Sequence, residues 1–139
     1  IFQNDPRVLY VSSHQAPLYP HTGHAHETGV DNLLNLPLAE GAAGDRIQEI
    51  YRTRALPTLR AFRPQLLFIS AGFDAHHLDP LAGLNLEAED FIWLTQELMK
   101  VADECCEGRI VSVLEGGYSL AALRECSIAH VAALAGMLD

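Results

Sequence analysis

The segment LLFISAGFDAHHLDP, at Leu66–Pro80, carries the clearest structural pattern in this sequence. The stretch opens with a run of apolar, mostly branched side chains, and Ala71 and Gly72 end that run. A short apolar run that ends in a turn of small residues is typical of a strand buried on both faces, as in a parallel sheet. Asp74 is the first charged residue after the run. We therefore expect Asp74 just beyond the carboxyl end of a buried strand, where open α/β sheets hold their ligands.

Strand and helix patterns alternate along the rest of the chain. Strand patterns cover Val8–Ser12, Leu66–Ser70 and Ile110–Leu114, and helical periodicity covers Asp45–Phe62, Glu87–Glu107 and Leu120–Leu138. Asn32–Leu38 is a candidate for a short extra strand, and Pro57 is expected to kink or divide the first helix. This alternation predicts repeated βαβ units, and hence a three-layer α/β fold with helices on both faces of a parallel sheet.

Composition indicates a globular protein with one domain, residues 1–139. Hydrophobic residues make up 49% of the chain, which is enough to bury a core, and no apolar run has the length of a membrane span. The formal net charge of −9 disfavours direct binding to nucleic acid and fits either a cationic substrate or simple solubility. The three cysteines show no disulfide or zinc-finger spacing, which predicts a reducing, cytoplasmic compartment.

Polar residues follow three of the predicted strands. His14, Asp74 and Tyr118 each lie within four residues of a strand's carboxyl end. Because parallel strands place their carboxyl ends on one rim of the sheet, we expect these three residues to converge on one site. Plainer interpretations also stand: Asp74 is then a helix or turn cap, and Tyr118 only packs against its neighbours.

Histidines offer two further candidate sites. His76 and His77 follow the first acid after the central strand and suit metal binding or base catalysis, although surface histidines in a loop are the commoner case. The trio His21, His24 and His26 has H-x-x-H-x-H spacing within a long irregular stretch. Metal binding by this trio is the less favoured interpretation, since a flexible loop does not fix the ligand geometry that zinc requires.

The segment Gly116-Gly117-Tyr118 follows the last predicted strand as a tight turn that presents a phenol. The two glycines either let the backbone pass close to a ligand or only form the turn. A phenol on the rim of a sheet is able to donate a hydrogen bond to a developing oxyanion. As a phosphate-binding loop the segment is poor, because it has neither a G-x-G-x-x-G pattern nor a Walker lysine.

Taken together, these motifs resemble the histone deacetylase superfamily, nearest its class II and bacterial amidohydrolase-like members. Three segments carry the resemblance in the family's order: VLYVSSHQAPLYPHTG at Val8–Gly23, SAGFDAHHLDPLAGLNL at Ser70–Leu86, and VLEGGYSL at Val113–Leu120. The resemblance covers essentially the whole chain. It implies the arginase/deacetylase fold and zinc-dependent hydrolysis of an acetylated amine, such as acetyl-lysine or an acetylpolyamine.

The resemblance also assigns roles by motif position. It implies that Asp74 is one of three zinc ligands and that Tyr118 is the phenol that stabilises the tetrahedral oxyanion. It implies a substrate channel lined by Tyr19, Leu81, Gly116 and Gly117. Segments that contribute to the family's K+ sites match Ser12 and, farther out, Phe2, Asp5 and Val8. One departure concerns the mouth of the channel, because His21 stands where the family usually has glycine.

Two motifs of the family have no counterpart in this sequence. They are the Asp-x-His pair, which supplies the other two zinc ligands, and the histidine pair that serves as general base; both lie upstream of the segment that Ile1 opens. The chain therefore resembles the carboxyl-terminal part of a deacetylase domain, with a partial fold. Since catalytic zinc normally has three protein ligands, we expect weak zinc binding and no activity by this chain alone. The alternative is a non-catalytic binding or structural module that kept the scaffold.

The resemblance further implies a strand, absent here, between Val8–Ser12 and Leu66–Ser70. Without it, those two strands either pair directly or leave unpaired backbone groups, which cost about 1–3 kcal/mol each when buried. Open strand edges beside apolar side chains recruit other strands. We therefore expect self-association, or association with a missing N-terminal segment.

Overall fold

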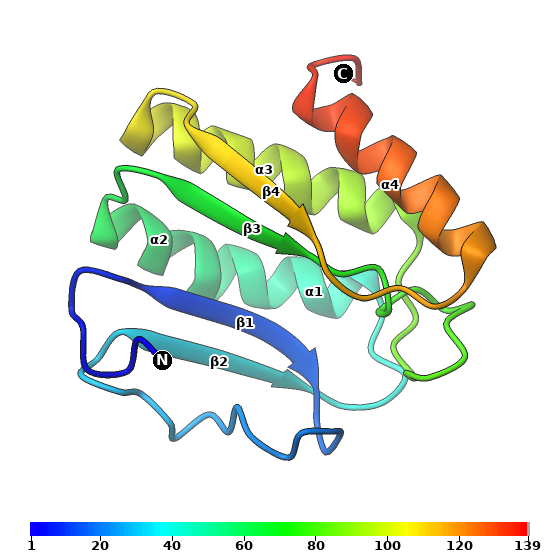
Figure 1. Ribbon diagram of the computed structural model, residues 1–139, viewed down its shortest axis with the longest axis horizontal. Helices are drawn as coiled ribbons and strands as arrows, with labels where there is room; N and C mark the ends of the chain where they lie inside the picture. The colour runs from blue at the N-terminus through cyan, green and yellow to red at the C-terminus, as the bar shows by residue number, and fades with distance from the viewer. Residues whose placement is uncertain (139) are drawn as a thin grey trace.

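The computed structural model describes residues 1–138, in which two separate two-stranded sheets lie in front of a layer of helices (Figure 1). The strands are β1 (Tyr10–Gln15), β2 (Leu33–Leu38), β3 (Leu67–Ala71) and β4 (Ile110–Leu114). The helices are α1 (Gly44–Ile50), a π-helical segment (Tyr51–Ala55), α2 (Leu56–Phe62), α3 (Ala88–Cys106) and α4 (Leu120–Leu134). The predicted α/β class is confirmed, and so is the extra strand, which is β2.

Both sheets are parallel. Tyr10 of β1 is opposite Leu33 of β2, and Leu67 of β3 is opposite Ile110 of β4. All four strands point the same way, so their carboxyl ends share one rim (Figure 1). The predicted first strand was placed too early, since β1 runs on to Gln15, and His14 therefore lies inside the strand and not beyond its end.

Helix positions follow the sequence pattern closely. A reciprocal capping box starts α3: the Glu87 side chain accepts from the third residue of the helix, and the Asp90 carboxylate accepts from the Glu87 amide at 3.0 Å. Glu107 ends α3 in the left-handed conformation, followed by Gly108. The predicted division of the first helix near Pro57 is confirmed: a π-helical segment separates α1 from α2, and Pro57 lies in the first turn of α2, where its missing N–H is tolerated.

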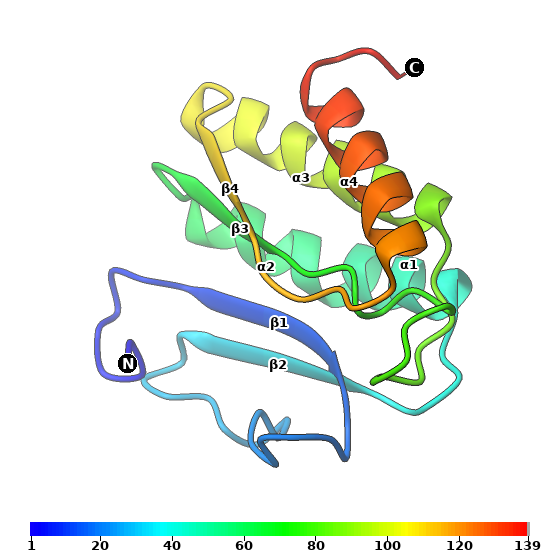
Figure 2. The ribbon, with the colours of Figure 1, turned by 45° about the vertical axis from the view of Figure 1, so that its right-hand side comes forward.

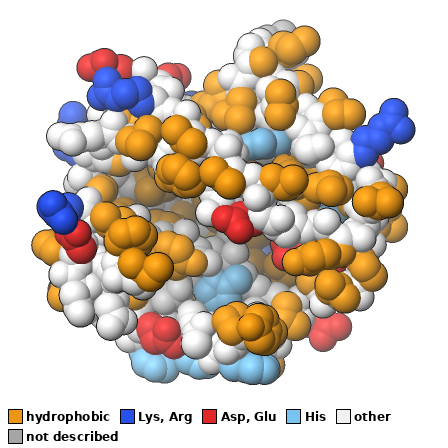
Figure 3. Space-filling view, viewed as in Figure 1, with side chains coloured by type: hydrophobic (Ala, Val, Ile, Leu, Met, Phe, Trp, Pro, Cys, Tyr) orange, Lys and Arg blue, Asp and Glu red, His pale blue; other side chains and the backbone are white. Residues whose placement is uncertain are grey.

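Helices cover only one face of the β3–β4 sheet within the described residues. Leu67 is buried on the helix side, whereas Phe68, the next residue, is 60% exposed on the other side. Its neighbour across the sheet, Val111, is also exposed. We expected this strand to be buried on both faces, and that detail is wrong for Phe68. Hydrophobic side chains are correspondingly visible over the strand face in the space-filling view (Figure 3).

The edges of β1 and β3 face each other without pairing, since β1 bonds only to β2, and β3 only to β4, among residues 1–138. A cavity of about 300 Å³ lies in this region and is lined by Ser13 of β1, Ile69 of β3 and Tyr51. A hollow at the centre of the strand face marks the same opening (Figure 3). Of the two outcomes expected for the flanking strands, the structure therefore has the open one. Within the described residues, every helix is too short or too polar to cross a lipid bilayer.

A buried polar network joins α4 to α3 and β4, which pack side by side (Figure 2). The Thr95 hydroxyl donates to the carbonyl oxygen of Phe91 at 2.6 Å and therefore accepts from His130 Nδ1, 2.8 Å away. In the neutral ring, His130 Nε2 then carries no hydrogen and accepts from the Ser112 hydroxyl at 2.9 Å. Burial lowers the pKa of His130 and so favours this neutral form over the protonated ring.

We predict that this network makes stability depend on pH. Below the ordinary histidine pKa of about 6.5, the unfolded chain binds a proton at His130 that the native state resists, so the free energy of unfolding falls as the pH falls. Denaturant titrations from pH 7.5 to 5 measure this slope. The slope should be shallower in His130→Gln and unchanged in the control His24→Gln, at an exposed histidine. An identical slope in His130→Gln and in the unsubstituted protein would show that His130 is not the group responsible.

Candidate functional site

Backbone hydrogen bonds join the loops that leave β3 and β4. The Glu115 amide donates to the carbonyl oxygen of Ala71 at 3.0 Å, and the Phe73 amide donates to that of Gly116 at 2.9 Å. These bonds extend the pairing of the two strands by one step beyond their ends. They place Asp74, the residue after Phe73, beside the Gly116 turn. The predicted position of Asp74, just past the carboxyl end of the central strand, is confirmed.

Two glycines form a cradle around the Asp74 carboxylate. A Cβ atom at Gly116 would lie 2.5 Å from Asp74 Oδ2, and one at Gly72 would lie 3.1 Å from Oδ1. Side chains larger than hydrogen therefore have no room at Gly116 unless the carboxylate moves. This contact explains the first glycine of the GGY segment as a close approach of backbone to a functional group.

The environment of Asp74 disfavours its charge. Burial raises the pKa of its carboxyl group, and the nearby charge of Asp79 raises it further, against a bond to the Asp74 amide that lowers it. No Lys, Arg or His of residues 1–138 contributes to this pKa. A half-buried carboxylate without a cationic neighbour is suited to receive a cation from outside the protein.

The second glycine of the turn, Gly117, is required for a different reason, which is its backbone conformation. Gly117 has a φ of +132°, a conformation that side chains rarely adopt, and a Cβ there would lie 3.3 Å from Phe73 Cβ. Tyr118 follows this turn and is 56% exposed. The turn therefore presents the phenol to solvent at the rim, as the sequence predicted, and does not pack it into the core.

A cavity of about 680 Å³ opens at this rim in front of β1. Its lining includes Asp74, His14, Ser12 and Tyr19 together with residues of the loop after β1. His14 and Asp74 were both predicted for one site, and the structure brings them to one cavity. The lining does not include Tyr118 or the predicted wall residue Leu81, which is exposed nearby on the loop after β3.

The residues predicted for K+ are split between two places. The backbone carbonyl oxygens of Phe2, Asp5 and Val8 all accept from Asn32 Nδ2, at 2.8, 3.0 and 2.9 Å. An amide NH₂ has two hydrogens, so three oxygens converge on a group that satisfies only two of them fully. Ser12 lies apart from this group, with its hydroxyl 2.9 Å from His14 Nδ1. K+ binding at either place stays a prediction, and Asn32 is the partner that sequence reasoning missed.

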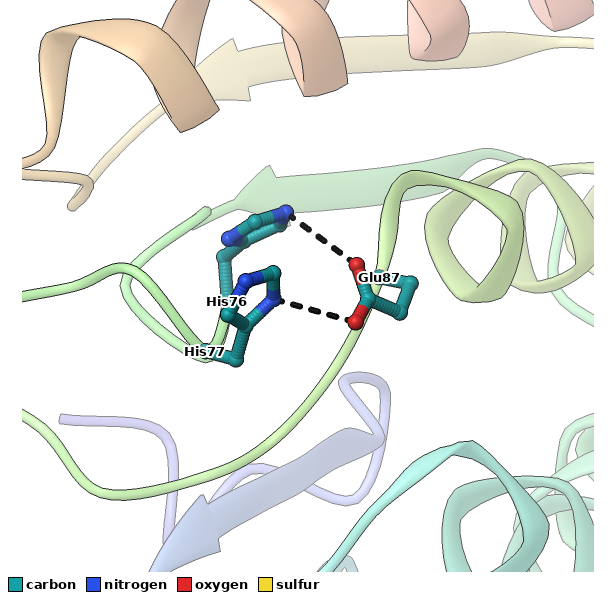
Figure 4. A group of neighbouring side chains, drawn as sticks. All are labelled: His76, His77 and Glu87. Atoms are coloured by element: carbon teal, nitrogen blue, oxygen red, sulfur yellow. Dashed lines mark ion pairs between the residues drawn. The ribbon is translucent and has the colours of Figure 1, made fainter.

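Two histidines and one acid form a compact group after β3 (Figure 4). His77 Nδ1 lies 3.1 Å from one Glu87 carboxylate oxygen, and His76 Nε2 lies 3.9 Å from the other. We favoured exposed histidines here, which is wrong for His76, only 2% exposed. His76 Nδ1 accepts from the Leu78 amide at 3.1 Å, so in the neutral ring Nε2 holds the hydrogen and points it toward Glu87. The group therefore acts as a link between this loop and α3, because a metal at Nε2 would require the His76–Leu78 bond to break.

The predicted His21, His24 and His26 trio does not form a metal-spaced group in the described part of the chain. The rings of His24 and His26 stack in parallel, with centroids 5.4 Å apart. Glu27 accepts from the amides of Gly23 and His24 at 3.2 Å, and these bonds lower the pKa of its carboxyl group. The three histidines are therefore not brought together here, and the Glu27 carboxylate fixes the loop through the two backbone amides.

We predict a graded effect of the two cradle glycines. Gly116→Ala should cost about 1–3 kcal/mol of stability, because the new methyl group overlaps the Asp74 carboxylate. Gly72→Ala is the matched control, since its Cβ needs a shift of only a few tenths of an ångström. Urea denaturation measures both. Asp74→Ala should restore stability to Gly116→Ala, because it removes the overlapping atoms; additive losses in the double variant would contradict the proposed contact.

Comparison with known proteins agrees with this geometry. A family model described as the histone deacetylase domain matches residues 1–134. A probable deacetylase of Archaeoglobus fulgidus is 39% identical and covers 98% of this chain, and a histone deacetylase-like amidohydrolase of Pseudomonas aeruginosa is 36% identical and covers 99%. The chain spans 39% and 37% of the lengths of these two relatives.

Solved structures give the same result. A crystal structure of the HDA15 HD domain superposes with a TM-score of 0.92 at 32% identity, over 98% of this chain and 39% of that one. The histone deacetylase Clr3 superposes with a TM-score of 0.90 at 31% identity, over 97% of this chain and 24% of that one. With the family's motifs in order and its fold reproduced, the chain belongs to the histone deacetylase family.

Proposed function

We propose that this chain carries part of the active site of a zinc-dependent amide hydrolase that removes acetyl groups from acetylated amines. The observation that carries the proposal is the Asp74 carboxylate, half-buried, without a cationic neighbour, and cradled by glycines beyond β3. Family membership supports the reaction class, and several relatives are described as deacetylases. These matches do not favour the alternative of a non-catalytic module.

The residues of this chain fit zinc only in part. A carboxylate is a suitable zinc ligand, and the cradle fixes its position, but catalytic zinc has three protein ligands and an open position. Among residues 1–138, the one metal-spaced group is His76, His77 and Glu87, and Asp74 is not part of it. We therefore propose that Asp74 is one ligand of a site whose other ligands lie outside this chain, and we assign no step to the metal.

Tyr118 has a role that does not depend on which ligands complete the site. Its exposed phenol is able to donate a hydrogen bond to the carbonyl oxygen of the acetyl group. That oxygen gains negative charge only as the amide carbon becomes tetrahedral, so the bond strengthens toward the transition state. We propose that Tyr118 stabilises this oxyanion.

The test of this role is Tyr118→Phe in the complete gene product. We expect kcat to fall about a hundredfold or more, a loss of about 3 kcal/mol, with a much smaller change in KM, because the hydrogen bond acts on charge that exists only in the transition state. Tyr10→Phe removes the hydroxyl of another exposed tyrosine, one that lines the cavity beside Asp74, and shows whether the loss of any nearby phenol has the same effect. Equal kcat values for Tyr118→Phe and the unsubstituted protein would dispose of the role.

A second assay tests the proposal that the other zinc ligands lie outside this chain. With a fluorogenic acetyl-lysine peptide and added zinc, residues 1–139 alone should show no turnover, because one carboxylate does not hold a catalytic metal. Turnover that is abolished by a chelator and by Asp74→Ala would contradict this expectation and would mean that the chain is sufficient.

We also propose that the purified chain self-associates, with a second copy covering the open edges of β1 and β3 and the bare face around Phe68. Parallel sheets are normally covered on both faces, and open edges beside apolar side chains pair readily. Light scattering coupled to size exclusion at low micromolar concentration should report a dimer or larger species. A monodisperse monomer whose melting is independent of concentration would refute the proposal.

A further inference from the structure

Asp79 lies between two predicted site residues and contacts the backbone of both. Its Oδ1 accepts from the Leu81 amide at 2.9 Å, and its Oδ2 accepts from the Tyr118 amide at 2.8 Å. Asp79 is only 8% exposed. One buried carboxylate therefore connects the loop after β3 with the loop after β4, using both of its oxygens.

Burial of this carboxylate needs an explanation. A buried ionised carboxylate is costly unless strong hydrogen bonds replace its hydration, and no Lys, Arg or His side chain within residues 1–138 forms a salt bridge with Asp79. Its two backbone donors are thus its compensation. Charge-assisted bonds of this kind are short and fix geometry, which is what a positioned backbone requires.

The hydrogen bond from the Tyr118 amide to Asp79 is important because few other contacts hold Tyr118 in place. The phenol is exposed and makes no side-chain hydrogen bond among the described residues. Its ring swings about two side-chain torsions from the Tyr118 Cα. Gly117, the residue before Tyr118, has a φ of +132° and lacks a side chain that would restrict the backbone there. The hydrogen bond to the Asp79 carboxylate therefore fixes the Tyr118 backbone directly after this glycine.

We propose that Asp79 is a positioning residue, which fixes the Tyr118 phenol relative to the Asp74 loop and, with its other oxygen, holds the backbone of Leu81. This inference rests on the proposed role of Tyr118 and deepens it. It assigns Asp79 no contact with substrate. Its effect on the reaction passes through Tyr118, and that separates it from a residue that only stabilises the loop.

The first test requires no activity. Amide hydrogen exchange, followed by NMR, should show the Tyr118 amide protected relative to that of Gly117, for which residues 1–138 provide no acceptor. In Asp79→Asn the Tyr118 amide should exchange about tenfold faster or more, because the neutral side chain has one acceptor oxygen for the two backbone amides that Asp79 satisfies with two charged ones. The matched control, Asp103→Asn on the exposed side of α3, should leave it unchanged. The comparison of Tyr118 with Gly117 uses the unsubstituted protein, so it tests the hydrogen bond from Tyr118 to Asp79 even if Asp79→Asn does not fold. A Tyr118 amide that exchanges as fast as the Gly117 amide would overturn the proposal.

The second test is a double-mutant cycle on kcat in the complete gene product. Asp79→Asn should lower kcat about tenfold, but should change it less than about twofold once Tyr118→Phe is present, because the two residues act through one phenol. Equal factors in both backgrounds would mean a merely structural role and would overturn the proposal. If the unsubstituted protein has no deacetylase activity, the proposed function fails, while the exchange experiment still decides whether Asp79 holds Tyr118.

Discussion

The close approach of the Gly116 backbone to the Asp74 carboxylate is the constraint on which the rim of this molecule depends. It joins the loop after β3 to the loop after β4 at a distance that only glycine permits. The backbone hydrogen bond from the Phe73 amide to the Gly116 carbonyl oxygen extends the parallel pairing to the same point. A helix-backed sheet thus delivers an acid and a phenol to one edge, which is the arrangement that open α/β sheets use for ligands.

Much of this could be predicted from apolar periodicity and glycine placement. The helix patterns at Asp45–Phe62, Glu87–Glu107 and Leu120–Leu138 correspond to observed helices, and Asp74 lies where the LLFISAG run indicated. Buried polar contacts could not be predicted in this way, because they join residues far apart in the chain. The bonds from Asn32 to three carbonyl oxygens and the bond from Asp79 to the Tyr118 amide have no local signature. His76 looked like a surface histidine because its burial depends on packing against the start of α3.

The exposed face of β3–β4 and the unpaired edges of β1 and β3 are both surfaces that a folded α/β protein normally covers. Phe68 has a large apolar side chain of the kind found in cores, but it lies on an uncovered sheet face. Parallel sheets rarely leave such a face in water. The chain spans 39% of the length of its archaeal relative, whereas its own strands and helices match solved deacetylase domains closely. The strands and helices that carry Asp74 and Tyr118 therefore have the arrangement of the family, while one sheet face and two strand edges beside them are uncovered in the described residues.

In the mechanism that we propose, Asp74 contributes one ligand to a zinc site, and Tyr118 assists the chemistry without binding the metal. Zinc content per chain, measured by elemental analysis of the complete gene product after dialysis, distinguishes these two roles. We expect about one zinc in the unsubstituted protein and in Tyr118→Phe, and almost none in Asp74→Asn, since a catalytic zinc site that loses one of three protein ligands is left with too few to hold the metal. Zinc retained at the same stoichiometry in Asp74→Asn would show that Asp74 is not a ligand.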